Sequence, residues 1–410
     1  MSTNWAGNIA FDPRRVRRPG TVDELRRLVA ASTRIRALGT GHSFSRLIEG
    51  PGELVSVAGL PATMHLDGAQ VTVAGGVRYG ELARYLDGAG YALANLGSLP
   101  HISVAGACST GTHGSGDRNG NLATAVSAVE LVGADGDLVT VRRGDPDFPG
   151  VALGLGACGI VTRLTLDVVP AYDMRQWVYE NLALDRLTGH FADIMAAGYS
   201  VSLFAGWTAP RIDQVWLKRR VDEPGAADAP PVRWGATLAD GPRHPIPDLP
   251  PEQCTEQLGA PGPWYTRLPH FRLEFTPSSG DELQSEFLLP RASGGAAVAA
   301  LAGIRDRLAP VLQVCEIRTV AADELWVSPS YRRDSVALHF TWVKDAAAVD
   351  PVLAALEERL APLDARPHWA KLFRAAPPPY PRAADFVALL RRYDPAGKFR
   401  NEFLDRYFPA

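Results

Sequence analysis

At 410 residues the chain is long for a single hydrophobic core, so two domains, or one domain split by an insertion, are expected. Its 42 Lys and Arg residues are balanced by 45 Asp and Glu, which excludes the basic surplus that nucleic-acid binding normally needs. The four cysteines lie far apart with no CxxC spacing, so we expect reduced, buried thiols and no metal site.

The hydropathy of the sequence also excludes a membrane partner. The N-terminal stretch has no apolar segment typical of a secretion signal, and no stretch reaches the length of a membrane span. We therefore expect a cytoplasmic protein. The chain uses arginine for nearly all its basic residues, which leaves few lysines as candidate catalytic groups. Its four lysines are Lys218, Lys344, Lys371 and Lys398.

Residues 1–170 alternate short apolar runs, glycine turns and small helices. Thr21 and Glu24 have the spacing of a capping box at the start of a helix. Asp135-Gly136 separates two alternating apolar runs, which predicts a β-hairpin. Further strands are predicted at residues 34–39, 54–60, 70–77 and 159–170, with a helix at 81–90.

The pattern changes in residues 171–375, where longer alternating strands are separated by amphipathic helices. Strands are predicted at 201–207, 214–220, 271–275, 314–320 and 335–343, and helices at 185–197, 296–310 and 348–360. This order predicts a large antiparallel sheet with helices on one face. Residues 221–263, rich in Pro, Gly and Asp, are expected to form a surface excursion without a catalytic group.

The fold class expected from these segments is α+β with two domains. The boundaries predicted are 1–170 for the first domain, 171–375 for the second, and 376–410 for a C-terminal segment that returns to the first.

Two glycine-rich segments stand out, GTGHSF at 39–44 and GSLPHISVAGACSTGTHGSG at 97–116. Glycines let several backbone N–H groups gather around one anion, but neither segment fits GxGxxG or a P-loop. Either segment alone could be an ordinary turn. Together, each with a histidine and small hydroxyl residues, they favour a dinucleotide held mainly by backbone.

Polar residues also alternate with apolar ones in two predicted strands. Glu316 and Arg318 fall on one face of their strand, and His339 and Thr341 share a face of theirs. Two such strands predict a walled polar pocket, although a solvent-facing surface with an ion pair is an equally simple interpretation.

The order of motifs resembles a known family. The segments G-T-G-H-S, T-G-T-H-G and G-x-V-T-x-L-T-L are similar to the FAD domain of the vanillyl-alcohol oxidase family. EIRTVAADELW, HFTWV, RPHWAK and DPAGKF are similar to the bacterial alditol oxidases within that family. The likeness spans nearly the whole chain except residues 221–250. It implies a FAD-binding domain and a substrate domain with a large antiparallel sheet and flanking helices.

The resemblance implies that FAD is attached covalently through its 8α carbon to His42, which by itself could be a loop histidine capping a carbonyl. Cys108 could carry a second link to the flavin, but the resemblance favours a packed thiol. The other cofactor-binding residues implied are Ala37, Leu38, Gly39, Thr40, Gly41, Ser43, Gly97, Ser98, Ser103, Gly106, Thr110, Gly111, Thr112, His113, Ile160 and His368.

An aliphatic alcohol is too weak an acid for a side chain to ionise outright, so its oxidation needs cations around the developing alkoxide. Lys371 and Arg318 are the candidates to hold the C1 oxygen, and Lys371, if neutral, could also take the proton. Glu316 would accept hydrogen bonds from neighbouring hydroxyls and balance Arg318. Remaining substrate contacts are expected from Ser98, His339 and Thr341.

The implied activity is oxidation of a terminal primary alcohol of an alditol such as xylitol, sorbitol, mannitol or glycerol. Hydride would pass to flavin N5, and dioxygen would be reduced to hydrogen peroxide. Gly97 stands where alditol oxidases usually carry alanine, which would leave dioxygen a path to the flavin. A monomer with no partner beyond polyol and dioxygen is expected. The alternatives are an aldonolactone or hexose oxidase of the same fold, and a non-catalytic flavin- or carbohydrate-binding protein.

Overall fold

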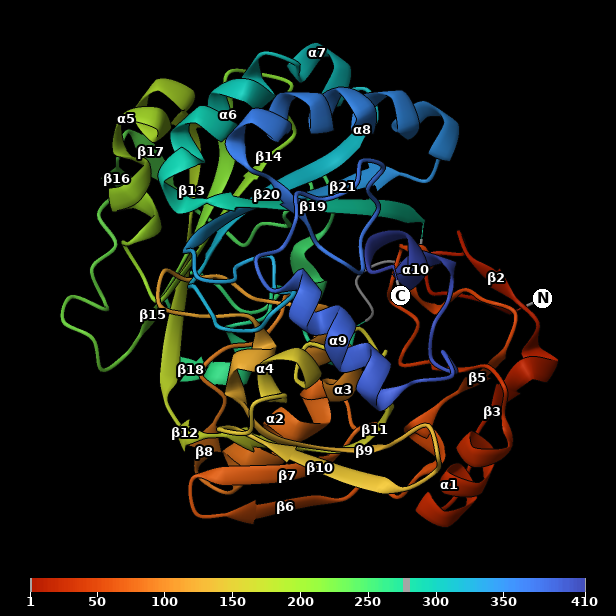
Figure 1. Ribbon diagram of the computed structural model, residues 1–410. Helices are drawn as coiled ribbons and strands as arrows, with labels where there is room; N and C mark the ends of the chain where they lie inside the picture. Colours follow the sequence, from red (N-terminus) through yellow and green to blue (C-terminus); the bar gives the residue numbers. More distant parts are fainter. Residues whose placement is uncertain (1, 276–280, 410) are drawn as a thin grey trace.

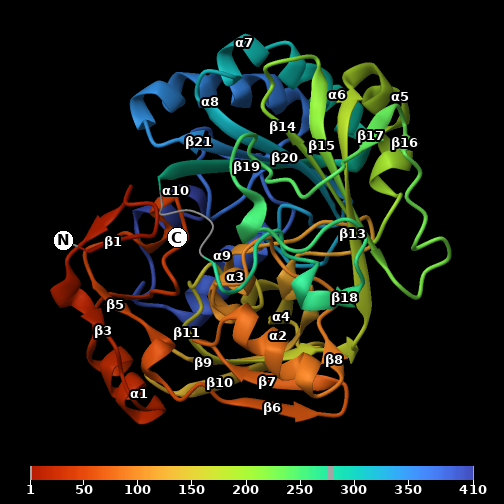
Figure 2. The same ribbon diagram turned by 180° about the vertical axis from the view of Figure 1, so that it is seen from behind.

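The computed structural model describes residues 2–275 and 281–409, and it places two antiparallel sheets one above the other (Figures 1 and 2). The lower sheet has five strands in the order β10-β9-β11-β7-β6, beside a three-stranded sheet in the order β3-β5-β4. The upper sheet has ten strands, in the order β16-β17-β13-β15-β14-β20-β21-β19-β22, with β18 paired to β13.

The elements of the first layer come from the N-terminal part of the chain. Its strands are β1 Ser2–Thr3, β2 Ala10–Phe11, β3 Val16–Arg17, β4 Ile35–Ala37, β5 Glu53–Val55, β6 Met64–Asp67, β7 Gln70–Ala74, β8 Tyr91–Ala92, β9 Val126–Val132, β10 Leu138–Arg142, β11 Ile160–Asp167 and β12 Val169–Pro170. Its helices are α1 Val22–Ala31, α2 Tyr79–Gly88, α3 Val104–Thr110 and α4 Phe148–Val151.

The upper layer and the C-terminal segment supply the rest. The strands are β13 Asp173–Ala183, β14 Ser200–Ala205, β15 Arg211–Arg220, β16 Val232–Arg233, β17 Ala236–Leu238, β18 Gly262–Pro263, β19 Glu282–Pro290, β20 Leu312–Val320, β21 Ser335–Val343 and β22 Arg366–Pro367. The helices are α5 Leu184–Met195, α6 Gly294–Ala302, α7 Arg305–Leu308, α8 Ala346–Leu360, α9 Ala383–Tyr393 and α10 Glu402–Tyr407.

Local sequence signals explain several of these boundaries. The Thr21 hydroxyl accepts a hydrogen bond from the Glu24 N–H and so caps α1, while the Glu24 carboxylate accepts from Gly20 instead of closing the box on Thr21. The predicted hairpin is confirmed: β9 and β10 pair across a turn in which Gly136 has a φ of +89°.

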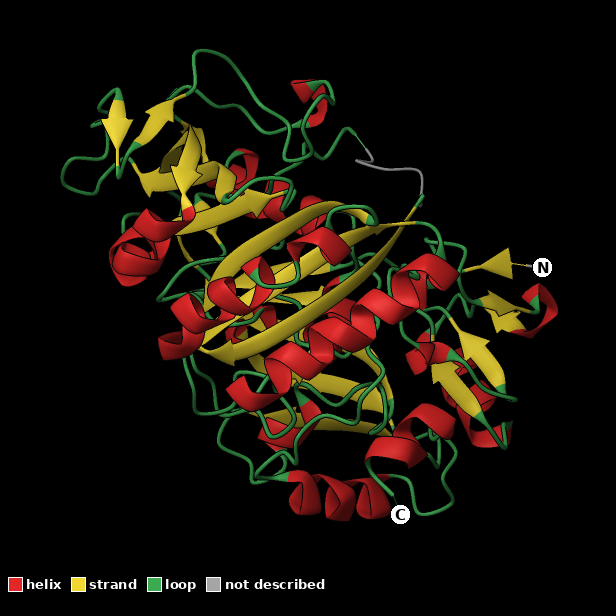
Figure 3. Cartoon of the chain, turned by 90° about the horizontal axis from the view of Figure 1, so that it is seen from above, coloured by secondary structure: helices red, strands yellow, loops and turns green. Residues whose placement is uncertain are grey.

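Apolar packing separates the two layers. Helices α5, α6 and α8 cover one face of the upper sheet, and their buried side chains share a core with that face (Figure 3). Buried side chains of the lower sheet form another core, to which α9 and α10 contribute Phe386, Leu389 and Leu404. The opposite face of the upper sheet is left to face the lower layer.

Some predicted elements differ. No strand forms over residues 271–275, where Phe271 makes only an isolated bridge with Cys254. The predicted helix over 296–310 is interrupted after Ala302, and β13 and β19 were not predicted at all. In both of these strands charged residues interrupt the apolar ones, so the alternation of polar and apolar positions that predicts a strand is weak.

Candidate active site

A cavity of about 980 Å³ lies between the two layers. This is at the upper end of the roughly 300–1,000 Å³ typical of small-molecule sites. One end is lined by the loop after β4 and by the segment that contains α3. The other end is lined by the inner faces of β19, β20 and β21.

The loop after β4 presents backbone donors to this cavity. No acceptor within residues 2–275 and 281–409 is found for the N–H groups of Gly39 to Ser43, so all five are available to a ligand. Gly41 has a φ of +74°, a conformation that favours glycine. Added Cβ atoms at Gly39 and Gly106 would stand 3.0 and 2.9 Å from the Ser103 hydroxyl. Glycine at positions 39 and 106 therefore keeps the space around the cradle free of side chains.

The N-terminal segment holds the same loop in place. The Trp5 N–H donates to the Gly41 carbonyl at 2.8 Å, and the Asn4 amide donates to the Ser43 carbonyl at 2.8 Å. The Trp5 indole stacks on the His42 ring, with centroids 5.2 Å apart. Trp5 was not predicted as a site residue, since nothing in the sequence links it to the later loop.

His42 lies with its Nδ1 3.0 Å from the Thr40 hydroxyl. Burial, and to a smaller extent the nearby charge of Lys371, lower the pKa of His42 to about 4. The imidazole is therefore uncharged at neutral pH and keeps a nitrogen lone pair, which a covalent bond to carbon requires.

Most of the predicted cofactor-binding residues line this one cavity. They are Ala37, Leu38, Gly39, Thr40, Gly41, His42, Ser43, Gly97, Ser98, Ser103, Gly106, Thr110, Thr112, His113 and His368. Two predicted residues do not line it. Gly111 ends α3 against Leu153, and Ile160 is buried in an apolar cluster while its neighbours Gly159 and Val161 line the cavity.

Cys108 is also absent from the lining. Its thiol lies 3.3 Å from the Tyr79 hydroxyl, and burial raises its pKa to about 12. A thiol this hard to ionise is a poor nucleophile, which agrees with a packed thiol. No group of three or more His, Cys, Asp or Glu side chains in the described parts of the chain is arranged to hold a metal.

The cavity fits FAD on these observations. Free backbone amides at one end suit a pyrophosphate, and the glycines allow close approach of a large ligand. Apolar side chains also line the cavity, among them those of Val55, Val57, Leu99 and Ile102.

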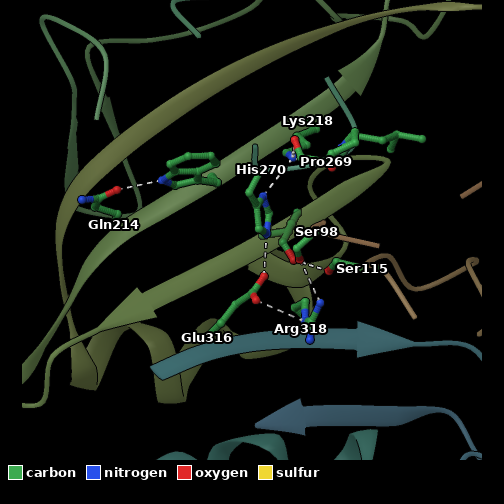
Figure 4. A network of polar contacts seen from close by, with 12 residues as sticks. Ser98, Ser115, Gln214, Lys218, Pro269, His270, Glu316 and Arg318 are labelled. Atoms are coloured by element: carbon green, nitrogen blue, oxygen red, sulfur yellow. Dashed lines mark hydrogen bonds and ion pairs between the residues drawn. The ribbon is translucent and has the colours of Figure 1, made fainter. Parts of the chain in front are cut away.

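At the sheet end, Arg318 lies between two carboxylates (Figure 4 shows its contact with Glu316). Its guanidinium donates to Glu286 Oε1 at 2.6 Å, its Nε is 3.5 Å from Glu316 Oε2, and its Nη1 donates to the Ser98 hydroxyl at 3.2 Å. Glu316 and Arg318 are each 5% exposed, which excludes the solvent-facing alternative. The predicted alternation is confirmed, since Cys315 and Ile317 belong to the core on the other face.

Strand register brings these groups together. Glu316 of β20 and Glu286 of β19 both lie opposite His339 of β21, and Gln284 lies opposite Thr341. Side chains opposite one another on neighbouring strands share a face, so the sheet end of the cavity is a continuous polar surface.

Glu286 is a site residue that sequence reasoning missed, because β19 itself was missed. Burial alone would raise its pKa, but the charges of His113 and Arg318 outweigh it and hold the pKa well below its usual range. His113 Nε2 lies 3.1 Å from Glu286 Oε1. The Glu316 pKa is lowered in the same way, against burial, by Arg318 and His270.

Lys371 reaches the cavity beside these residues. Its ammonium donates to Gln284 Oε1 and lies 5.0 Å from the centre of the Phe44 ring. Burial lowers the pKa of Lys371 to about 8, while the charge of Glu286 acts in the opposite direction. His339 Nε2 donates to the same Gln284 oxygen at 3.1 Å, and burial lowers the His339 pKa to about 3.

The Pro- and Gly-rich excursion contributes to the site, contrary to expectation. His244, Pro245, Ile246 and Leu249 line the cavity wall. The Gln214 side chain donates to the His244 carbonyl at 2.8 Å and so ties the excursion to β15. Composition alone could not show that this loop folds back over the sheet.

Comparisons with known proteins agree with this geometry. Residues 13–142 match the FAD binding domain family, and residues 281–407 match the D-arabinono-1,4-lactone oxidase family. The chain is 53% identical to an alditol oxidase from Streptomyces sp., covering 98% of this chain and 97% of that one. It is 26% identical to an L-gulono-1,4-lactone dehydrogenase from Mycobacterium tuberculosis, with 98% of each covered.

Among solved structures, cholesterol oxidase from B. sterolicum has a TM-score of 0.78 at 16% identity, covering 99% of this chain and 96% of that one. That likeness shows a shared fold. The fold and the cavity define an FAD-dependent oxidoreductase with the vanillyl-alcohol oxidase architecture. Within this class, the chain belongs to the alditol oxidase family. No helix in the described residues is long and apolar enough to cross a membrane.

The pairing of Glu286 with Arg318 generates a stability prediction. Glu286→Leu should lower the free energy of unfolding by about 3–5 kcal/mol, because it removes the nearer of the two carboxylates that neutralise the buried Arg318. Glu286→Gln should be milder, since its amide oxygen still accepts from Arg318. The Glu286 pKa is lowered from 4.5, so its contribution is complete above that pH and is lost as pH falls toward the folded-state pKa.

Denaturant unfolding at pH 7 and pH 4 measures this effect. The stability difference between wild type and Glu286→Gln should shrink on acidification, because below about pH 4.5 the glutamate of the unfolded chain takes up a proton that the folded state does not. A difference that stays constant or grows would contradict the ion pair.

Proposed function

We propose that the protein oxidises a terminal primary alcohol of a small polyol to the aldehyde, with dioxygen as acceptor and hydrogen peroxide as product. One observation carries the proposal: Arg318, Lys371, Glu316 and Ser98 meet in the cavity that also contains the backbone cradle. The 53% identity to a Streptomyces alditol oxidase supports it. We further propose a cytoplasmic monomer, as the sequence leads us to expect.

The two cations, Arg318 and Lys371, would make the oxidation of an alcohol possible. FAD, when bound, supplies the acceptor for the hydride of the alcohol carbon and passes the electrons on to dioxygen. Arg318 and Lys371 would stabilise the negative charge that develops on the C1 oxygen, in a site where burial strengthens electrostatic interactions. With a pKa near 8, Lys371 can exist uncharged near neutral pH and so could take the hydroxyl proton.

Glu316 and its neighbours would recognise the rest of the polyol. A carboxylate accepts hydrogen bonds from hydroxyl groups, so Glu316 suits the C2 hydroxyl. Ser98, His339 and Thr341 line the same stretch of cavity and would bind further hydroxyls. Because acidic and basic groups alternate here, an uncharged polyol fits better than a carboxylate substrate.

A lactone is the second candidate substrate. The match of residues 281–407 to the D-arabinono-1,4-lactone oxidase family favours a lactone, because β19, β20 and β21 all lie within that range. The 53% relative, which covers the same strands, favours the polyol.

We also propose that FAD is bonded through its 8α carbon to His42, which is partly buried, uncharged and stacked on Trp5. Acid-precipitated wild-type protein should form a yellow pellet, whereas His42→Ala should release its flavin into the supernatant. His244→Ala, which changes another histidine of the cavity wall, should keep the pellet yellow. A colourless wild-type pellet would overturn the covalent bond.

Lys371→Ala should slow reduction of the flavin by xylitol about 10²–10³-fold, because it removes a charge needed mainly in the transition state. Arg318→Ala should act in the same direction. The matched control is Lys344→Ala, a lysine whose side chain is 41% exposed. Anaerobic stopped-flow absorbance measures each rate. Reduction of Lys371→Ala at the wild-type rate would rule out this role.

We propose that the absence of a side chain at Gly97 leaves dioxygen a path to the flavin. A Cβ added at Gly97 would lie 3.7 Å from Thr112 Cγ2 and 3.8 Å from the His113 carbonyl, so alanine fits without a backbone shift. Gly97→Ala should therefore slow reoxidation of reduced enzyme by dioxygen and leave anaerobic reduction by xylitol nearly unchanged. Stopped-flow reoxidation at several dioxygen concentrations tests this, and wild-type rates in both Gly97→Ala and Gly97→Val would refute it.

A further inference from the structure

A chain of buried polar contacts leads away from the site behind Glu316 (Figure 4). Lys218 on β15 is 0% exposed, and it does not line the cavity. Its ammonium donates to the Leu268 carbonyl at 2.6 Å, to the Pro269 carbonyl at 3.1 Å and to His270 Nδ1 at 3.1 Å. His270 Nε2 in turn lies 2.7 Å from Glu316 Oε1.

Glu316 determines the tautomer of His270. Its carboxylate, whose pKa is held below its usual range, can only accept, so the ring proton lies on Nε2 and is donated to Glu316. Nδ1 therefore accepts from Lys218, whose charged form has three donors for three acceptors and whose pKa is lowered by burial to about 7. Burial lowers the pKa of His270 to about 4, so the ring is neutral and carries that single proton.

The surroundings of His270 leave its ring little freedom. Phe204 and Trp216 pack edge-on against it, with centroids 5.4 and 5.2 Å away. The His270 backbone N–H also donates to the Ser98 carbonyl at 3.1 Å. His270 lines the cavity, but both its ring nitrogens are occupied, so it has no free hydrogen-bonding group to offer a substrate.

The hydrogen bond from His270 to Glu316 also limits how Glu316 can pair with Arg318. The Nε of Arg318 has no hydrogen-bond partner in the described parts of the chain and stands 3.5 Å from Glu316 Oε2. Guanidinium and carboxylate groups readily close into a bidentate pair. With Oε1 held by His270, Glu316 cannot turn to offer both oxygens to Arg318, and both groups stay directed at the cavity.

We propose that Lys218 and His270 are positioning residues: they hold the Glu316 carboxylate in the orientation that binds a polyol hydroxyl. The inference rests on the proposed function and extends it to a lysine that no substrate touches. It assigns a role to Lys218, one of the four lysines of this arginine-rich chain. Lys218 lies on β15 and does not line the cavity.

Lys218→Met and His270→Leu should each raise the KM for xylitol about 10–100-fold, the loss expected for one hydrogen bond to a charged group. The kcat at saturating xylitol should fall less, because Lys371 and Arg318 remain. His270→Gln should recover most of the affinity, since its amide can donate to Glu316 in place of Nε2–H. In a Glu316→Gln background, Lys218→Met should have little further effect on KM.

Lys398 provides the matched control. Its ammonium likewise has three acceptors, which are all backbone carbonyls, those of Val29, Ala30 and Ala134, and none of these residues lines the cavity. Lys398→Met should lower stability and leave the KM for xylitol unchanged. If Lys398→Met raises KM as much as Lys218→Met, or if His270→Leu and His270→Gln both keep the wild-type KM, the positioning role is wrong.

The His270 tautomer gives a readout that needs no turnover. Ring ¹⁵N chemical shifts from selectively labelled protein should show the Nε2–H form of His270 in wild type and in Lys398→Met. Lys218→Met should keep this tautomer, because Glu316 still accepts from Nε2, but should shift the Nδ1 resonance, because Nδ1 loses its donor. Failure of xylitol to reduce wild-type enzyme would overturn the proposed function alone, whereas an Nδ1–H tautomer in wild type would overturn the positioning role alone.

Discussion

The site depends on one constraint, a buried guanidinium that must be neutralised without losing its ability to act on substrate. Arg318 is almost completely buried, and a charge in such surroundings is tolerated only with close partners. The chain supplies two carboxylates, Glu286 at 2.6 Å and Glu316 at 3.5 Å. The shorter contact provides the neutralising partner, and the longer one leaves an acceptor directed at the cavity.

Sheet register makes this arrangement possible. Glu316 and Glu286 sit on strands either side of β21 and both lie opposite His339. A slip of one residue in either strand would exchange the polar and apolar faces and place these charges against helices α6 and α8. The apolar face resists such a slip, because Phe340 and Trp342 are fully buried in its core and stack with centroids 5.1 Å apart. The core on one face thus keeps the chemistry of the other in place.

Sequence reasoning could predict whatever depends on short spacing. Alternation placed Glu316, Arg318, His339 and Thr341 on the correct faces, and the glycine loop with His42 marked the cradle. Strand neighbours, by contrast, are a long-range property. Nothing in a single sequence states that β19 pairs with β21, so Glu286 and Gln284 were missed.

The same limit applied to contacts across loops. Trp5 contacts His42 only because the N-terminal segment folds over the later loop, and His270 directly precedes residues 271–275, which were wrongly predicted to be a strand. The sequence contains one signal for Lys218, because it is a lysine within an arginine-rich strand. An ammonium offers three donors around a point, whereas a guanidinium is planar, and the three converging acceptors at Lys218 suit only the former.

The central claim is that this group of two cations and a carboxylate acts on an alcohol of an open-chain polyol. The most direct test mixes anaerobic wild-type protein with xylitol, and separately with L-gulono-1,4-lactone, while flavin absorbance is followed by stopped flow. The account predicts that xylitol bleaches the flavin in a single turnover and that the lactone leaves it oxidised. Bleaching by the lactone, with no response to xylitol, would contradict it.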